Sequence, residues 1–340
     1  MVKSMAEHEH VHTHSKEMIV CDNLVKIYKT KDTEVLALQG MDMTIHEGEF
    51  VAIIGRSGSG KSTFLNMVGG LDRPSAGRLL VDELDLFKLS EEDLVSYKRR
   101  TVGFIWQNNA RNLLPYLTAR QNIELPMEFM QRKEKANQVP LFPPHSSKSE
   151  RADYLLDLVG LADKKHSRLT QLSGGEQQRI AIAIALANEP RILLADEPTG
   201  SVDVATSNII FDLFRKLNQE FGLTIVMVTH DQALSHKVSR VISIQDGKIS
   251  SERLIRESYA DLLSRAGTLA ASDRTAEDEE ATGRDSHEEF LIMDRVGRVQ
   301  IPRDVLDDLG FSDNKVRLRI QDGRLELTPG TDSGKEESDE

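Results

Sequence analysis

A short glycine-rich segment between an apolar run and a helical pattern constrains the fold of this chain more than any other feature. Residues 49–54 have the pattern of a buried strand, and residues 63–68 begin a helix. The segment between them, residues 55–62, fits the phosphate-binding pattern G-x-x-x-x-G-K-[ST]. Backbone N–H groups in such a loop can approach phosphate oxygens closely, because glycine has no side chain to obstruct them. Strand, loop and helix in this order predict an α/β domain that binds a nucleoside triphosphate.

The loop also carries the two side chains that a triphosphate needs. Lys61 supplies a positive charge for the β and γ phosphates, and the Ser62 hydroxyl supplies an oxygen ligand for Mg²⁺. A fortuitous glycine turn is the alternative, and the flanking strand and helix argue against it. The nucleotide-binding residues predicted in this loop are Gly55, Ser57, Gly58, Ser59, Gly60, Lys61, Ser62 and Thr63.

Two further apolar runs end in side chains that suit triphosphate hydrolysis. Residues 191–195 form a buried-strand pattern that ends in Asp196 and Glu197. Asp196 can hold the water shell of the metal ion, and Glu197 can act as general base toward the attacking water. Ordinary strand-end carboxylates are the alternative, but the Pro-Thr-Gly-Ser-Val-Asp run of residues 198–203 argues against it. The second apolar run, residues 224–229, ends in His230, which can contact the γ phosphate and the water from the far side.

The signals are weaker for three residues of this site. Gln107 follows Gly-Phe-Ile-Trp at residues 103–106 and offers a neutral amide that can contact Mg²⁺ from a mobile loop. Tyr28 precedes a short polar loop, and its ring can either stack on adenine or pack against the protein. A strand-end histidine such as His230 is more often structural, but its position after the acidic pair favours the functional interpretation.

The segment Ser173-Gly174-Gly175 predicts a second anion site that has neither a lysine nor a catalytic acid. It opens a helix that begins with Glu176, so N–H groups point outward at the helix start. Such a half-site can close over ATP held by Lys61 of a second copy. We therefore expect a head-to-tail homodimer that sandwiches two nucleotides.

Composition limits the setting in which this chemistry takes place. The net charge of −12 over 340 residues argues against a general nucleic-acid binder. The single cysteine, Cys21, cannot form an internal disulfide, which favours a reducing cytoplasm. No apolar run approaches the roughly 20 residues that cross a bilayer, and the N-terminus has no apolar secretory segment. If the protein serves a membrane process, we expect the membrane part to be another chain.

At this point the residues resemble the nucleotide-binding subunits of ABC transporters, over about residues 17–250. Within that superfamily the chain is similar to the macrolide-export and lipoprotein-release (MacB/LolD-like) branch. The segments that carry this likeness are residues 103–108 (GFIWQN), 113–119 (LLPYLTA), 122–126 (NIELP) and 196–200 (DEPTG). The resemblance implies that Tyr28 stacks on adenine, Gln107 lies in the Q-loop, residues 173–176 form the signature, residues 201–203 with Asp203 form the D-loop, and His230 is the switch.

The same resemblance implies a fold, ligands and partners. The fold is a P-loop α/β cassette with a RecA-like core, an antiparallel β subdomain and a helical subdomain, and the ligands are ATP and Mg²⁺. The expected partners are FtsX-like permease subunits, so the ATPase would lie on the cytoplasmic face of a bacterial membrane. The permease selects the substrate, which leaves lipoproteins, peptides, antibiotics and amino acids as candidate cargoes. Regulation of a cell-wall hydrolase, without any cargo, is a further alternative.

The predicted domains are a disordered tail at residues 1–16, an ATPase domain at 17–256, a linker at 257–288, a small β-rich unit at 289–329 and an acidic tail at 330–340. The tail carries His8, His10, His12 and His14 at alternate positions, which permits metal binding, although its polar composition favours disorder. A proline-containing insertion at residues 131–149 departs from the MacB/LolD-like pattern.

The small C-terminal unit follows a strand–turn–strand, helix, hairpin pattern. Strands at residues 290–294 and 298–301 flank a turn with Gly297, and Pro302 and Gly310 enclose a short helix. A hairpin follows, turning at Asp322-Gly323. This unit resembles an AbrB-like swapped-hairpin domain, a fold whose members usually dimerise and often bind DNA. Seven Arg and Lys against nine Asp and Glu between residues 287 and 329 favour dimerisation or regulation over DNA binding.

Two other classes of protein remain as rivals. A soluble ABC ATPase that acts on DNA or ribosomes would carry long coiled-coil or zinc insertions, or two cassettes in one chain, and this sequence has neither. A transcriptional regulator built on the C-terminal unit, with the ATPase as a sensor, is the second rival. DNA binding would distinguish it from the transporter hypothesis.

Overall fold

A computed structural model describes residues 16–31, 33–107, 113–130, 140–231, 237–255, 287–293, 297–299, 301, 303–309, 316–321 and 324–329. The predicted histidine tail up to residue 15, residues 131–139 of the insertion, residues 257–286 of the linker and the acidic tail lie outside the described residues. Pro302, Gly310 and the Asp322-Gly323 turn also lie outside them.

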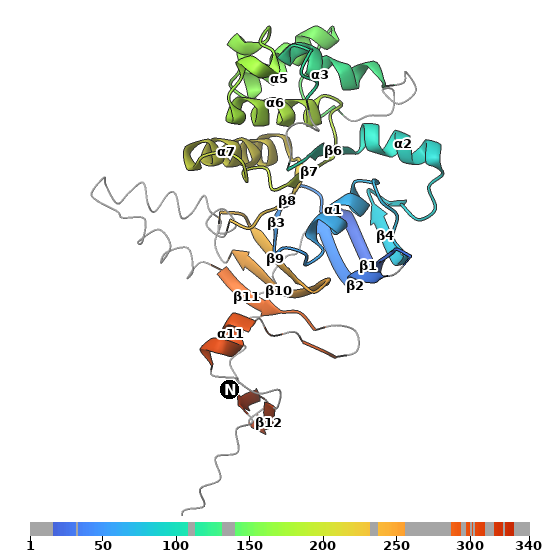
Figure 1. Ribbon diagram of the computed structural model, residues 1–340, viewed down its shortest axis with the longest axis vertical. Helices are drawn as coiled ribbons and strands as arrows, with labels where there is room; N and C mark the ends of the chain where they lie inside the picture. Colours follow the sequence, from blue (N-terminus) through green and yellow to red (C-terminus); the bar gives the residue numbers. More distant parts are fainter. Residues whose placement is uncertain are drawn as a thin grey trace, which may run out of the picture.

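A seven-stranded sheet forms the centre of the molecule (Figure 1). Its order is β11-β10-β9-β3-β8-β7-β6, in which β9, β3, β8, β7 and β6 are parallel and β10 and β11 are antiparallel. The strands span Phe50–Ile54 (β3), Val102–Ile105 (β6), Ile192–Asp196 (β7), Thr224–Val228 (β8), Arg240–Gln245 (β9), Lys248–Ile255 (β10) and His287–Leu291 (β11). The inner strands β3, β7 and β8 are almost wholly buried, as expected for parallel strands covered on both faces.

A second, antiparallel sheet packs beside the first, with α1 (Lys61–Val68) between them. Its order is β2-β1-β4-β5, with β1 at Glu17–Lys29, β2 at Glu34–His46, β4 at Ala76–Val81 and β5 at Leu84–Asp85. The side chains of Phe64 and Leu65 on α1 join those of Val51 and Ile53 on β3 in the hydrophobic cluster that connects the two sheets. This packing fixes the start of α1, and so the end of the glycine-rich loop, against the central sheet.

A group of helices lies on the other side of the central sheet, with α6 (Gly174–Leu186) and α7 (Val204–Phe221) against its strands and α3 (Ala119–Glu128) and α5 (Lys148–Leu158) packed on α6 (Figure 1). Helix α2 (Glu91–Arg100) lies near β6. Two short 3₁₀ turns, Ala162–Lys164 and Leu169–Gln171, lie between α5 and α6. Phe50 and Ala52 of β3 belong to this second hydrophobic cluster, because successive strand residues point to opposite faces. Among the described residues, no helix combines the length and apolar character needed to cross a membrane.

The predicted C-terminal helix and hairpin are present, but the two strands predicted before them are not found as predicted. The first is β11, at residues 287–291, and of the second, predicted at residues 298–301, only a single bridge at Val299 is described. Strand β11 pairs with β10 at the edge of the central sheet, and the Ile292 N–H donates to the Ser250 carbonyl at 3.2 Å. The predicted boundary at residue 289 therefore falls inside a strand of that sheet. A bridge between Met293 and Val299 closes the turn at Gly297. Helix α11 (Arg303–Asp308) and the hairpin of β12 (Val316–Gln321) and β13 (Arg324–Pro329) follow.

Candidate nucleotide-binding site

The glycine-rich loop connects β3 to α1 and is shaped by glycines that no other residue can replace. Gly55 has φ 153°, and a Cβ there would lie 2.2 Å from the Ile244 carbonyl oxygen. Gly60 has φ 106°, and a Cβ would lie 2.7 Å from the Ala37 carbonyl oxygen. The loop is therefore pressed against the backbone of two neighbouring segments, which leaves its N–H groups in a fixed arrangement. Such a fixed arrangement suits the binding of phosphate oxygens.

The amino group of Lys61 is held within this loop. Its Nζ donates to the carbonyl oxygens of Gly55 at 2.7 Å and Arg56 at 2.9 Å, and the residue is buried. Burial lowers the pKa of Lys61, while the negative charges of Glu197 and Asp196 act in the opposite direction. The negative charges at the end of β7 therefore favour the charged form of Lys61.

The Ser62 hydroxyl and the Asp196 carboxylate form a pair of oxygen ligands. The hydroxyl donates to Asp196 Oδ1 at 3.1 Å, across the carboxyl ends of β3 and β7. Burial raises the pKa of Asp196, and the hydrogen bond from Ser62 partly opposes the rise. Carboxylate and hydroxyl oxygens are ligands that Mg²⁺ accepts, so the donor set fits this ion.

Three predicted residues meet at the ends of three adjacent parallel strands. Gln107 follows β6, Glu197 follows β7 and His230 follows β8. Gln107 Nε2 donates to Glu197 Oε2 at 3.0 Å, and His230 Nδ1 lies 3.3 Å from the same oxygen. Glu197 has φ 47°, which is rare for a residue with a side chain, and its N–H donates to the Val228 carbonyl at 2.9 Å. This backbone conformation at Glu197 is a site feature that the sequence did not reveal.

Tyr28 lies at the end of β1, on the same side of the molecule as the start of α1. Its side chain is 38% exposed, and its hydroxyl donates to Asp72 Oδ2 at 2.8 Å. Burial and this hydrogen bond raise the pKa of Tyr28, while a hydrogen bond with the Thr63 hydroxyl acts to lower it. The ring therefore lies beside the first turn of α1, where Thr63 was predicted to bind nucleotide.

The predicted half-site at Ser173 is at the beginning of α6. Ser173 Oγ accepts the Glu176 N–H at 3.2 Å and Glu176 Oε2 accepts the Ser173 N–H at 2.7 Å, so these two groups satisfy each other. A Cβ at Gly174 would meet nothing within 4 Å, whereas one at Gly175 would lie 2.5 Å from Thr206 Cγ2 on α7. The pKa of Glu176 is lowered, mainly by the Ser173 backbone bond. Contact with α7 brings this segment next to Asp203, which caps that helix by accepting the Thr206 N–H at 2.9 Å.

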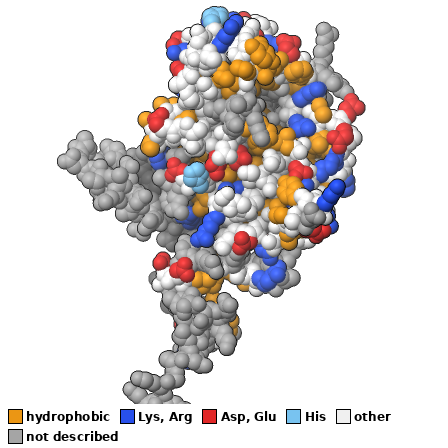
Figure 2. All heavy atoms as spheres, viewed as in Figure 1, with side chains coloured by type: hydrophobic (Ala, Val, Ile, Leu, Met, Phe, Trp, Pro, Cys, Tyr) orange, Lys and Arg blue, Asp and Glu red, His pale blue; other side chains and the backbone are white. Residues whose placement is uncertain are grey.

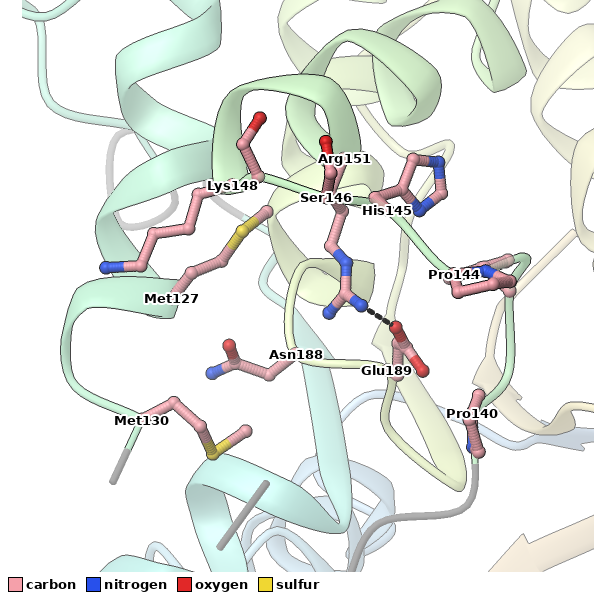
Figure 3. Close-up of a pocket in the computed structure, with 12 residues that line it drawn as sticks. Met127, Met130, Pro140, Pro144, His145, Ser146, Lys148, Arg151, Asn188 and Glu189 are labelled. Carbon is pink, nitrogen blue, oxygen red and sulfur yellow. Dashed lines mark ion pairs between the residues drawn. The ribbon is translucent and has the colours of Figure 1, made fainter. Parts of the chain in front are cut away.

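The described residues also line an open pocket of about 470 Å³ in the helical region, away from the phosphate loop (Figure 3). Met127 and Met130 line one side, and the ion pair of Arg151 with Glu189 lies across from them. Glu189 Oε2 also accepts the Leu141 N–H at 2.9 Å, which connects the middle of the predicted insertion to the turn before β7. None of the predicted nucleotide-binding residues lines this pocket, so it is separate from the candidate site.

Comparison with known proteins shows the family. The pattern of the family described as ABC transporter matches residues 38–200. An uncharacterised ABC transporter ATP-binding protein of Thermotoga maritima is 43% identical over 69% of this chain and 94% of its own length. The lipoprotein-releasing system ATP-binding protein LolD 1 of Rhodopseudomonas palustris is 39% identical over 69% and 99%. The macrolide export ATP-binding/permease protein MacB of Hyphomonas neptunium is 41% identical over 69% of this chain and 34% of that longer protein.

A solved structure supports the same assignment. The dimeric, post-hydrolysis cassette MJ0796, bound to ADP and Pi, is 39% identical. It matches 71% of this chain and all of its own chain, with a TM-score of 0.62. This chain belongs to the ATP-binding proteins of the ABC transporter family. The predicted cassette fold, the ATPase activity and the ligands ATP and Mg²⁺ are thereby confirmed.

Proposed function

We propose that this chain is the ATP-hydrolysing subunit of a membrane transporter or mechanotransmission complex, and that it acts as a homodimer on the cytoplasmic face. The observation that carries this proposal is the meeting of Gln107, Glu197 and His230 at three adjacent strand ends. Each of these residues comes from a different part of the sequence, and one carboxylate oxygen is common to their contacts. Such an arrangement can position and deprotonate a water molecule beside the phosphates that Lys61 binds.

Each predicted residue then has a specific role. Lys61 and the loop N–H groups bind the β and γ phosphates, and Ser62, Asp196 and Gln107 would hold Mg²⁺. Bound there, this ion would neutralise charge on the phosphate oxygens. Glu197 accepts a proton from the attacking water, and His230 orients that water and the γ phosphate. Tyr28 stacks on adenine, with its edge held at Asp72.

The open space beside Gly174 supports the head-to-tail dimer. Apart from the helix's own backbone and the neighbouring residues, none of the described residues lies within 4 Å of a Cβ at this position, although alanine is favoured over glycine within helices. A partner's triphosphate would occupy that space, held by Ser173, Gly175 and the start of α6, with Asp203 at the same interface. The dimeric state of the similar cassette MJ0796 supports this arrangement.

The proposed membrane partner is a permease of the FtsX-like type. Similarity to LolD, whose name assigns it to a lipoprotein-releasing system, and to MacB, whose name combines ATP-binding and permease functions, supports such a pairing. Regulation of a cell-wall hydrolase through that permease, or transport of amino acids or peptides, are the alternatives. Co-purification with a four-span membrane protein from detergent extracts would support the pairing, and recovery with ribosomes or DNA would contradict it.

The C-terminal unit is proposed to contribute to dimerisation, in an AbrB-like arrangement. Val316 and Leu318 on β12 are 48% and 56% exposed and lie on one face of the strand, because they are two residues apart. The excess of nine Asp and Glu over seven Arg and Lys between residues 287 and 329, with the net charge of −12 for the whole chain, disfavours DNA as the partner. On the ATPase part of the molecule, positive and negative side chains are mixed over the face that Figure 2 shows.

Glutamine at position 197 provides the test of the hydrolytic dimer. Glu197→Gln retains the shape of the side chain but cannot accept a proton, so we expect hydrolysis to fall by roughly 100-fold or more. With ATP bound, this variant should form a stable dimer in size-exclusion chromatography with light scattering. Lys61→Ala is the control. It removes the positive charge that binds the phosphates, so this variant should bind ATP weakly and remain monomeric. Hydrolysis by Glu197→Gln at the wild-type rate would contradict the role of Glu197 as base.

A further inference from the structure

A buried lysine lies against the ring that we assign to adenine. Lys26 is 8% exposed, and its Nζ lies 4.7 Å from the centroid of the Tyr28 ring. The two residues are two apart on β1, so their side chains leave the same face of the strand. An ammonium group at this distance is attracted to the π face of an aromatic ring. Lys26 therefore occupies one face of Tyr28.

The same ammonium group and the Tyr28 hydroxyl both bind one carboxylate. Lys26 Nζ donates to Asp72 Oδ1 at 2.6 Å and to the Arg73 carbonyl at 2.8 Å, while the Tyr28 hydroxyl donates to Asp72 Oδ2 at 2.8 Å. The Arg73 N–H also donates to Asp72 Oδ1, at 2.8 Å. Lys26, Asp72 and Tyr28 thus form a closed triad in which both the tip and one face of the ring are fixed.

The triad is anchored to the helix that begins at the phosphate loop. The Asp72 N–H donates to the Asn66 carbonyl of α1 at 3.2 Å, and the Tyr28 hydroxyl lies within hydrogen-bonding reach of Thr63 in the first turn of α1. ATP connects its base to its phosphates through a ribose, so the two ends of the ligand must be recognised at a fixed separation. Contacts to the first turn of α1 and to Asn66, one turn further along, hold the ring at one position relative to Lys61.

We propose that Lys26 and Asp72 are positioning residues for the base of ATP, holding Tyr28 so that only its outer face is open for stacking. This inference rests on the proposed role of Tyr28. Its physical basis is pre-organisation: a ring whose tip and inner face are already fixed loses little conformational freedom when adenine stacks on it. Neither Lys26 nor Asp72 needs to touch the nucleotide, so their effect is confined to ligands that contain a base.

A pair of probes separates this role from a general structural one. Mg²⁺-ATP carries the base, and inorganic tripolyphosphate with Mg²⁺ carries only the phosphates. We expect Lys26→Met to weaken ATP binding by roughly three- to tenfold in isothermal titration calorimetry, with no change for tripolyphosphate. Tyr28→Leu should weaken ATP binding by about tenfold or more, again without affecting tripolyphosphate. Lys88→Met, which removes a surface lysine paired with Asp85 at 2.9 Å, is the matched control and should leave both affinities unchanged.

The double variant gives the decisive result. If Lys26 acts through the ring, adding Lys26→Met to Tyr28→Leu should cause no further loss of ATP affinity. A further loss in the double variant, an equal loss for tripolyphosphate, or an unchanged ATP affinity in Lys26→Met would overturn the inference. Tyr28→Phe repeats the test without removing a buried charge, and wild-type ATP affinity in that variant would count equally against it. An unchanged affinity in Tyr28→Leu would instead show that the base does not stack on Tyr28, which is a failure of the proposed function itself.

Discussion

Asp196 illustrates the conflict between stability and function at a single residue. Burial raises its pKa above the ordinary value of 3.8, so the folded protein binds this proton more tightly than the unfolded chain does. The ionised carboxylate therefore reduces the stability of the folded state as pH rises above 3.8, and the full effect is reached above the folded-state pKa. The residue is suited to holding a metal ion because its charge is costly without one.

Replacement of the Asp196 carboxylate by an amide should show how much stability the buried charge removes from the folded state. We expect Asp196→Asn to raise the unfolding temperature of the nucleotide-free protein at pH 7 by about 2–4 °C. The difference should shrink as the pH is lowered toward 4, because the wild-type carboxylate becomes protonated. Differential scanning calorimetry across this pH range measures it, and hydrolysis by the variant should be lost. A lower unfolding temperature at pH 7 would contradict the argument from burial.

The site residues differ in how well the sequence reveals them. Asp196 and Glu197 lie at the end of an apolar strand, and Lys61 and Ser62 follow another such strand after the glycine-rich loop. The parallel-sheet pattern together with the loop motif is therefore enough to bring them to one edge. Lys26 and Asp72 were not predicted, because they lie 46 positions apart in the sequence and only the tertiary fold brings them together. Neither residue belongs to a local motif.

At the level of elements, the start of α6 has a glycine that its own chain does not require. Gly174 begins the helix, and no atom of the part of the chain that the structure describes fills the space beside it. Gly175 differs, since a Cβ there would collide with Thr206. Of these two glycines, therefore, only Gly174 can be substituted to test dimerisation without disturbing the fold.

The variant Gly174→Ala should affect ATP-driven dimerisation without reducing the stability of the fold. Alanine is favoured over glycine in helices by up to about 1 kcal/mol, so the unfolding temperature should stay the same or rise. ATP affinity of the monomer should not change, whereas ATP-driven dimerisation in the Glu197→Gln background should weaken by about tenfold or more, since the added methyl group would meet the partner's phosphate. Sedimentation velocity measures the dimer. Undiminished dimerisation would mean that this helix start does not face a nucleotide.

The strands also show where sequence patterns stop being informative. Buried parallel strands such as β7 and β8 are predictable, because both of their faces are apolar. Strand β11 was predicted as part of a separate unit, and its sequence, HEEFL, gives no sign of its partner. Its pairing is decided by the edge of β10, which is available only once the central sheet has formed.

For the molecule as a whole, two large hydrophobic clusters support the cassette, and the C-terminal hairpin lies beyond both. A two-stranded sheet is only marginally stable alone. The hairpin of β12 and β13 would therefore be stabilised if another surface buried its exposed apolar side chains. A second copy is the expected cover, since the cassettes are proposed to pair as well.

Two truncations should test this role of the hairpin. Ending the chain after residue 315 removes β12 and β13, and we expect self-association without nucleotide, measured by light scattering, to decrease several-fold. Ending it after residue 329 removes only the acidic tail and serves as the control. The ATP-dependent dimer of Glu197→Gln should survive both truncations. Equal association by both truncated proteins would exclude the hairpin as a dimer contact.

Strand β11 gives the C-terminal segment a mechanical connection to the catalytic machinery. It is hydrogen-bonded to β10, which continues through β9 to β3, and β3 leads directly into the phosphate loop. Because backbone hydrogen bonds join these strands, a force on the segment that follows β11 would be transmitted through the sheet to the phosphate loop. A regulator that binds this end of the chain would thus alter ATP turnover without contacting the nucleotide.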